Sequence, residues 1–200
     1  MGCGKNIWKV HVLPKAKHLL WRICKDCLPT RVQLQEKNVQ CPLDCPICEH
    51  EVEIEWHSLF DCNDSRNAWQ AAGLTLIISQ HMQSFTTTRE CILHICSETD
   101  KNTAGKIAML IWVLWNNRNN AVWNQTKEMG QQLGVKAMCL WSEWDAVQVA
   151  RNSNIQAEQQ QQITQWQRPA QGWYKCNVDA GLHHGKTTAG WCIKDNMGVC

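Results

Sequence analysis

Three cysteines and one histidine lie close together in the pattern C-P-I-C-x8-H-x4-C, which is formed by Cys45, Cys48, His57 and Cys62. Thiolate and imidazole groups are ligands that Zn²⁺ prefers, and four of them complete its tetrahedral shell. Because no coordination position stays open for a substrate, this spacing predicts a structural zinc ion rather than a catalytic one. Metal binding would then supply much of the free energy with which a small polar segment folds.

A second set of four ligands is also compatible with the sequence. Cys24-x2-Cys27 and Cys45-x2-Cys48 have the spacing of a four-cysteine zinc site. This alternative ranks second, because it leaves His57 and Cys62 without a role. Cys24 and Cys27 also end an apolar helical segment, where a buried cysteine is ordinary packing.

Charge is distributed unevenly along the first third of the chain. Residues 1–40 contain eight Lys and Arg against two acids, whereas residues 41–65 contain seven acids and no Lys or Arg. The basic segment is the candidate for contact with nucleic-acid phosphates, which the acidic loop at residues 49–55 would repel. A solvated helix face is the alternative explanation. The residues predicted to contact nucleic acid are Lys15, Lys17, Arg22, Lys25 and Arg31.

The cysteine content bears on the cellular compartment. The chain has 13 cysteines, an odd number, and they cluster with metal-ligand spacing and without a preceding signal peptide. This pattern favours a reducing intracellular setting, in the nucleus or cytoplasm, over secretion. No apolar run has the length of a membrane span, so no membrane partner is expected. Oligomeric state stays open.

Periodicity predicts several helices before the middle of the chain. Residues 15–27 form the first, opened by Pro14, and Thr30 can cap a second that runs to about residue 37. Residues 41–57 are expected to form a loop or short hairpin, followed by a helical turn from His57 to Cys62. Asp64 is expected to cap a helix through Ala72, with Gly73 after it.

Residues 103–125 show the clearest helical pattern, and a second apolar stripe follows from Leu133 to Trp144. The two helices are expected to pair as an antiparallel hairpin joined near Gly130. Their tryptophans are expected in the core, with a stacking platform for single-stranded nucleic acid as the alternative. Arg118 and Asn119 could contact phosphate or merely bridge helices.

The last part of the chain changes character. Residues 151–167 are rich in Gln and predict a flexible or weakly helical linker. Residues 174–180 then alternate as a strand with one buried face, residues 181–186 are expected to turn, and residues 189–194 form a second strand. Residues 195–198 read as the next turn. Because a lone hairpin is marginal in water, this region resembles the beginning of a larger domain.

The chain resembles a known family in three places. Residues 7–72 resemble the zinc-binding region that follows reverse transcriptase in plant non-LTR (LINE-type) retrotransposons, on the residues Ile7, Trp8, Pro14, Lys15, Leu20-Trp21-Arg22, Leu28-Pro29-Thr30, Leu34, Cys45, Cys48, His57, Phe60, Cys62 and Trp69. The segment from Ile111 to Trp123 is similar to the helical connector of such proteins. Residues 166–200 resemble the opening of their ribonuclease H-like domain, through Trp166, Pro169, Gly172-Trp173, Lys175, Asn177-Val178-Asp179, Gly190 and Asp195.

The resemblance implies a ribonuclease that cuts the RNA of RNA–DNA hybrids with about four carboxylates and two Mg²⁺ ions. Only the first catalytic acid has a counterpart, Asp179, on the polar face of its strand. One carboxylate cannot hold two metals, so the chain is expected to be an inactive, truncated fragment that does not bind Mg²⁺. A working ribonuclease that takes its other acids from a second chain is a further alternative.

The sequence thus predicts an α+β, mainly α fold with a small zinc-stabilised helical module, a helical connector and the first strands of an incomplete ribonuclease H-like fold. The expected segments are residues 1–72, 73–150, 151–165 and 166–200. The expected function is binding of RNA or an RNA–DNA hybrid. The alternative is a zinc-stabilised protein–protein interaction module, which salt dependence of binding would distinguish.

Overall fold

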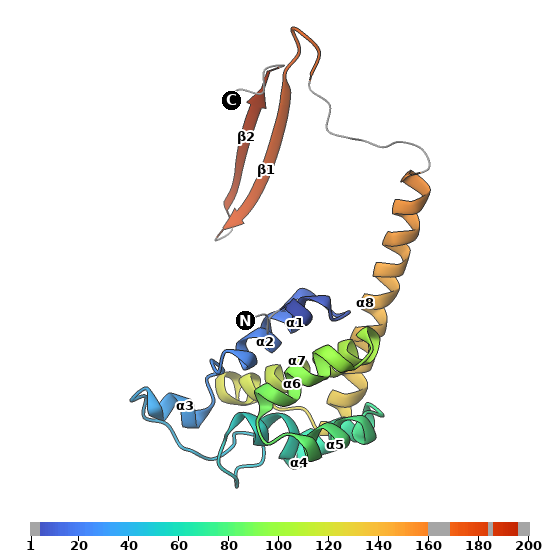
Figure 1. Ribbon diagram of the computed structural model, residues 1–200. Helices are drawn as coiled ribbons and strands as arrows, with labels where there is room; N and C mark the ends of the chain where they lie inside the picture. Colours follow the sequence, from blue (N-terminus) through green and yellow to red (C-terminus); the bar gives the residue numbers. More distant parts are fainter. Residues whose placement is uncertain (1–4, 160–168, 184–185, 196–200) are drawn as a thin grey trace. The chain divides into compact units, whose positions relative to one another are not determined.

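The computed structural model describes residues 5–159, 169–183 and 186–195, and the chain divides into two compact units. The first unit ends at Ala150 and the second begins at Arg151. Helices dominate the described part of the first unit, and the second unit contains a two-stranded antiparallel sheet, as Figure 1 shows. The prediction of a mainly helical α+β protein is therefore confirmed at this level. A ribonuclease H-like fold stays a prediction.

Most helices of the first unit are joined by short connections. In chain order the helices are α1 (Lys5–Lys9), α2 (Pro14–Cys24), α3 (Arg31–Glu36), the π-helical turn η1 (His57–Asp61), α4 (Asn63–Ala71), α5 (Thr75–Ser84), α6 (Thr88–Glu98), α7 (Lys101–Asn124) and α8 (Gly130–Gln159). A long segment separates α3 from η1, and the last of these helices, α8, continues into the second unit. The helix α8 continues into the stretch that the sequence predicts as a flexible or weakly helical linker.

Local sequence signals explain where several helices begin. Pro14 stands at the first turn of α2, and the Thr30 hydroxyl accepts a hydrogen bond from the Gln33 amide at the start of α3, as predicted. The Asp100 carboxylate caps α7 by accepting from the backbone amides of Asn102 and Thr103. Each cap satisfies backbone donors that have no partner within the helix.

The prediction that Asp64 caps a helix is wrong. The helix α4 already begins at Asn63, with Cys62 at the N-cap, so Asp64 lies in its first turn. The Asp64 carboxylate instead accepts a hydrogen bond of 2.9 Å from the backbone amide of Gly130, where α8 begins. The Asp64 side chain, which the local pattern assigned to a helix cap, thus makes a long-range contact instead. Gly73 follows α4 with a φ of 70°, as expected for a helix terminus.

A single hydrophobic core joins the region around the four metal-ligand candidates to the connector helices. The helix α7 contacts α2, α4, α6 and η1. The apolar residues that give α7 its helical pattern are all buried, namely Ile107, Leu110, Ile111, Leu114 and Trp115. The core also takes in Ile7, Leu20, Phe60 and Trp69. The position of each ligand therefore depends on packing that extends well beyond residue 72.

The predicted antiparallel pairing of α7 and α8 is supported by the order of their contacts. Asn117 and Glu128 exchange two hydrogen bonds near the connection, and Gly105 lies against Trp141 further along both helices. A Cβ atom on Gly105 would collide with the His11 carbonyl oxygen. Only glycine permits this approach, which lets the Trp141 indole donate to the same carbonyl.

The second unit contains the strands β1 (Lys175–His183) and β2 (Lys186–Lys194). They pair antiparallel in a register that sets Val178 opposite Trp191 and Asp179 opposite Gly190. The prediction of a turn over residues 181–186 is wrong, because strand pairing continues through Gly181 and Leu182 to His183. The partners of Gly181 and Leu182 are Thr188 and Thr187, and β-branched residues favour extended backbone.

One further expectation falls mostly outside the described residues. Only the first residue of the predicted turn at residues 195–198 belongs to the described part of the structure. Among the described residues, no helix combines the length and apolar character needed to cross a membrane.

Candidate metal centre

The first two candidate ligands lie on a short hairpin loop, as predicted for residues 41–57. Asp44 and Val52 form an antiparallel bridge, and the Cys45 amide donates to the Glu51 carbonyl at 2.6 Å. Between them the chain turns tightly, with the Glu49 amide donating to the Cys45 carbonyl at 2.8 Å. This turn brings Cys48 back beside Cys45.

The other two candidate ligands flank the π-helical turn η1. The Cys62 amide donates to the His57 carbonyl at 2.8 Å, an i→i+5 hydrogen bond. Residues five apart on a regular α-helix point about 140° apart, whereas the wider turn carries Cys62 back over His57. The predicted helical turn between these residues is therefore confirmed, and its π geometry explains how both side chains face one site.

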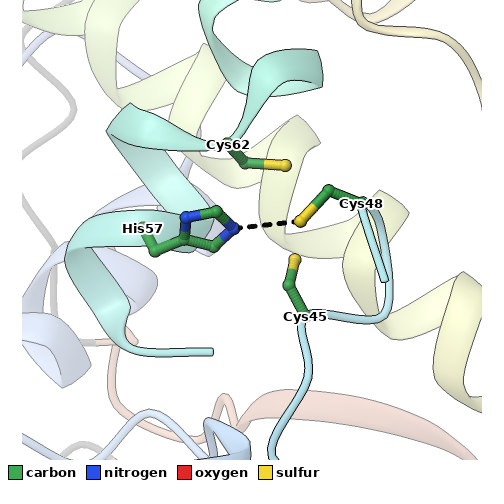
Figure 2. A group of neighbouring side chains, drawn as sticks. All are labelled: Cys45, Cys48, His57 and Cys62. Atoms are coloured by element: carbon green, nitrogen blue, oxygen red, sulfur yellow. Dashed lines mark hydrogen bonds between the residues drawn. The ribbon is translucent and has the colours of Figure 1, made fainter. Parts of the chain in front are cut away.

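The four side chains converge on a common centre, as Figure 2 shows. One ligand atom from each of Cys45, Cys48, His57 and Cys62 lies within 4.8 Å of the other three. The His57 Nε2 atom is 3.3 Å from the Cys48 sulfur. A zinc–sulfur bond of about 2.3 Å in a tetrahedral shell requires sulfurs about 3.8 Å apart, so the cluster has the dimensions of a zinc site.

Burial is the second property that suits this cluster to a structural metal. Cys45 and Cys62 are each 1% exposed and His57 is 9% exposed. The cluster provides four ligands, which fill a tetrahedral shell and exclude a bound substrate. The donor set therefore fits zinc in a structural role.

The two buried sulfurs interact electrostatically. A hydrogen bond between them raises the pKa of Cys45 far above its usual range, with burial as the next cause, and lowers the pKa of Cys62. The Cys45 sulfur also accepts from the backbone amides of Cys48 and Ile47, and Cys62 accepts from those of Asp64 and Ser65. These amides favour thiolates, the form in which cysteine binds a metal.

A buried ion pair fixes residues 41–56, which we call the metal loop, to the connector helix α7. The Glu53 carboxylate is fully buried and accepts two hydrogen bonds from the Arg118 guanidinium, which lies on α7. Glu53 also accepts from the Arg31 amide at 2.8 Å, at the start of α3. The guanidinium carbon lies 4.9 Å from the centre of the Trp115 ring. Such a pair is satisfied on every side and holds the loop, α3 and α7 in one arrangement.

This ion pair corrects one part of the sequence interpretation. The sequence predicts that the acidic loop at residues 49–55 repels phosphate, yet Glu53 does not face solvent. For Arg118 the sequence leaves open a phosphate contact or a bridge between helices, and the structure shows a different bridge, from α7 to Glu53 on the loop. No local signal singles out Glu53 among its acidic neighbours, because its partner lies 65 residues away.

The tip of the metal loop makes a second contact with the connector. The Lys127 ammonium donates to the Ile47 carbonyl at 2.9 Å and to the Glu49 carboxylate at 2.8 Å. This ion pair is exposed and raises the pKa of Lys127 while lowering that of Glu49. Exposed pairs contribute little to stability, so the buried pair is the main attachment.

The rival set of four cysteines does not assemble among the described residues. Cys24 is buried on α2, and the Cys27 thiol donates to the Arg22 carbonyl. Two other possible ligands nearby, Cys41 and His50, also lie outside the cluster. The Cys41 thiol donates to the Arg31 carbonyl at 3.6 Å, and His50 is exposed. The geometry therefore favours Cys45, Cys48, His57 and Cys62.

The predicted nucleic-acid contacts lie in different environments. Lys15 and Lys25 are exposed, whereas the Lys17 ammonium donates to the Trp8 carbonyl and burial lowers its pKa. Arg22 donates to the Cys27 carbonyl and Arg31 to the Asp44 carbonyl, and both arginines line one groove. The structure does not test whether any of the five binds nucleic acid.

The tryptophans divide between core and surface. Trp69, Trp115 and Trp141 are buried, as the core interpretation predicts. Trp123, at the end of α7, is 79% exposed, which contradicts the prediction that it lies in the core.

Asp179 lies in β1, opposite Gly190. Its side chain is outside the described part of the structure, so its predicted role is untested.

The comparison with protein families agrees with this geometry. Residues 2–69 match the family model for zinc-binding in reverse transcriptase. The matched segment contains all four residues of the metal cluster, as well as α1, α2 and α3. Neither the curated proteins nor the solved structures contain a match to the chain. The match confirms the resemblance to the reverse-transcriptase zinc-binding region and does not extend to the connector or to residues 166–200.

Proposed function

We propose that the first unit is a zinc-stabilised nucleic-acid-binding module inherited from a retroelement. The observation that carries this proposal is the convergence of four zinc ligands within a segment that matches the reverse-transcriptase zinc-binding family. Zinc has a structural role in this proposal. It holds the loop that carries Cys45 and Cys48 against η1, and this loop in turn contacts α3 and α7 through Glu53.

Nucleic acid is the partner that the charge distribution supports. Lys15 and Arg22 lie seven residues apart on α2, and therefore on one side of the helix, and Lys25 follows directly after its end. Neither lysine is paired with a carboxylate among the described residues. Uncompensated cations of this kind bind phosphates by releasing counterions. RNA or an RNA–DNA hybrid is the class of ligand that follows from the retroelement origin.

The test is a salt titration of binding to a labelled RNA–DNA hybrid. We expect affinity to fall steeply as salt rises, and Lys15→Gln with Lys25→Gln to reduce the slope by about 0.9 for each phosphate that the variant no longer neutralises. A matched control replaces Arg66 and Arg151, which are exposed outside the basic segment. An affinity for the hybrid that does not change with salt concentration would instead favour the protein–protein alternative. Absence of binding to the hybrid would overturn the proposal.

We further infer that residues 166–200 open a ribonuclease H-like domain in which Asp179 occupies the position of the first catalytic acid. The antiparallel pairing of β1 with β2 supports this proposal, as does the alternating pattern around Asp179. Residues 1–200 alone are expected to leave an RNA–DNA hybrid uncut in the presence of Mg²⁺. Cleavage that disappears in Asp179→Asn would show that the site is complete in this chain or in a dimer of it.

A further inference from the structure

A groove lies between α3 with its following loop and the C-terminal half of α7. Its volume is about 450 Å³. The walls are mostly apolar, and they are formed by Pro29, Leu34, Val39, Pro42, Val122 and Trp123. Three arginines also line it, and among the described residues no Asp or Glu does. We propose that this groove binds single-stranded nucleic acid, with a base stacked on Trp123 and phosphates bound by Arg22 and Arg31. This proposal rests on the function proposed above.

The Trp123 side chain is the first observation that points to such a ligand. It is 79% exposed at the end of a helix whose other tryptophan in this groove, Trp115, is 3% exposed. On the opposite wall of the groove, Val39 is 47% exposed. A large aromatic surface in water, next to a groove, is suited to stack on the face of a nucleobase.

The arginines supply the second observation. Arg22 and Arg31 each donate to a backbone carbonyl, of Cys27 and Asp44 respectively, and neither pairs with a carboxylate among the described residues. A guanidinium has five N–H donors, so a single carbonyl contact orients it and leaves donors for a phosphate. Arg118 differs, because Glu53 neutralises it and holds it in the groove floor.

The exposed Trp123 indole, together with the unpaired Arg22 and Arg31, favours a single strand over a duplex as the ligand. A duplex keeps the faces of its bases inside the stack, where the Trp123 indole cannot reach them. A single strand exposes both its base faces and its phosphates, and proteins bind it with aromatic platforms beside cationic grooves. An apolar peptide would fit the walls, but it would leave two unpaired arginines without a partner of opposite charge.

The experiment measures the affinity of the zinc-loaded full chain for a labelled oligouridylate of about ten nucleotides, within the usual site size. We expect Trp123→Ala to weaken binding about 5- to 150-fold, the range for loss of one stacked base. Trp123→Phe should recover most of the loss, because a smaller aromatic ring still stacks. Trp173→Ala removes another exposed tryptophan, in the second unit, and should leave affinity unchanged.

Salt titrations of the same oligonucleotide test the arginines. Arg22→Gln with Arg31→Gln should reduce the slope of log affinity against log salt by about 0.7 for each phosphate that is no longer neutralised, whereas Arg151→Gln should not. Zinc content and circular dichroism verify that each variant is folded. If the wild type binds no nucleic acid, the proposed function fails as well. If it binds and Trp123→Ala binds equally well, only the groove assignment is overturned.

Discussion

Glu53 and Arg118, which are 65 residues apart in the sequence, form a buried bidentate ion pair between the metal loop and α7. Glu53 is fully buried and Arg118 is 4% exposed, so neither charge can be solvated without opening the fold. The pair therefore holds the metal loop and α7 in one fixed arrangement. Loss of either partner would leave an uncompensated buried charge, which is far more costly than loss of an exposed pair.

We therefore expect Glu53→Gln and Arg118→Met each to lower the free energy of unfolding by about 3–5 kcal/mol. The double variant should lose much less than the sum of the two, because it leaves no buried charge without its counterion. Urea denaturation of the zinc-loaded proteins measures these values. Arg66→Met, which removes an arginine of an exposed pair with Asp61, should cost less than about 1 kcal/mol. Additive losses in the double variant would show that the two charges do not stabilise each other.

A histidine pair on α5 and α6 predicts acid sensitivity. The His81 Nδ1 and His94 Nδ1 atoms lie 3.2 Å apart. Burial and the neighbouring His94 lower the pKa of His81. Because the unfolded chain binds the proton more readily, the stability contributed by neutral His81 is present above about pH 6.5 and is lost as pH falls below it.

His81→Gln should consequently reduce the loss of stability between pH 7.5 and pH 5.5 relative to the wild type, since glutamine does not take up a proton. Thermal unfolding at both pH values measures the difference. Acid also releases zinc, but that loss is common to both proteins and cancels in the comparison. An unchanged pH dependence in His81→Gln would show that the pair does not titrate in this range.

Two cysteines of α6, buried Cys91 and half-buried Cys96, are predicted to resist alkylation. Burial raises the pKa of Cys91 and Cys96 to about 12 each, so almost no thiolate is present at neutral pH. Iodoacetamide should therefore modify exposed Cys139 well before either of them, as mass spectrometry of digested protein would show. After unfolding in urea all three should react at similar rates. Fast modification of Cys91 in the folded protein would contradict the packing of α6 against the core.

Metal removal gives a separate pattern of thiol reactivity. Zinc-bound thiolates react slowly, and burial protects Cys45 and Cys62 further. Addition of a strong chelator should make Cys45, Cys48 and Cys62 reactive together, because the loop loses the ion that holds it. Cys91 should respond less, since it lies in the helical core. Unchanged reactivity of the three ligands after chelation would indicate that no metal protects them.

The ligands of the metal site could be predicted from the sequence because their spacing is local. Cys45 and Cys48 share one turn, and His57 and Cys62 share another. The start of α6 carries a usable signal that the sequence interpretation misses. Thr87 and Glu90 have the spacing of a capping box, and the Thr87 hydroxyl accepts from the Glu90 amide and donates to the Glu90 carboxylate.

The remaining features depend on contacts between distant parts of the chain. The local pattern assigns Asp64 to a helix cap, but its carboxylate accepts from the Gly130 amide, a partner that no local pattern reveals. The same holds for Glu53 and Arg118. The exposure of Trp123, by contrast, has a local signal that the core interpretation overlooks, because eight residues after Trp115 it lies about 80° further round α7, away from the buried stripe.

The central claim is that one zinc ion, held by Cys45, Cys48, His57 and Cys62, organises the first unit. Elemental analysis of the purified protein tests it most directly, together with the variants Cys62→Ser and Cys27→Ser. We predict stoichiometric zinc in the wild type and in Cys27→Ser, and loss of zinc with loosening of the metal loop in Cys62→Ser. A metal-free wild type, or zinc that Cys62→Ser retains and Cys27→Ser loses, would contradict the claim.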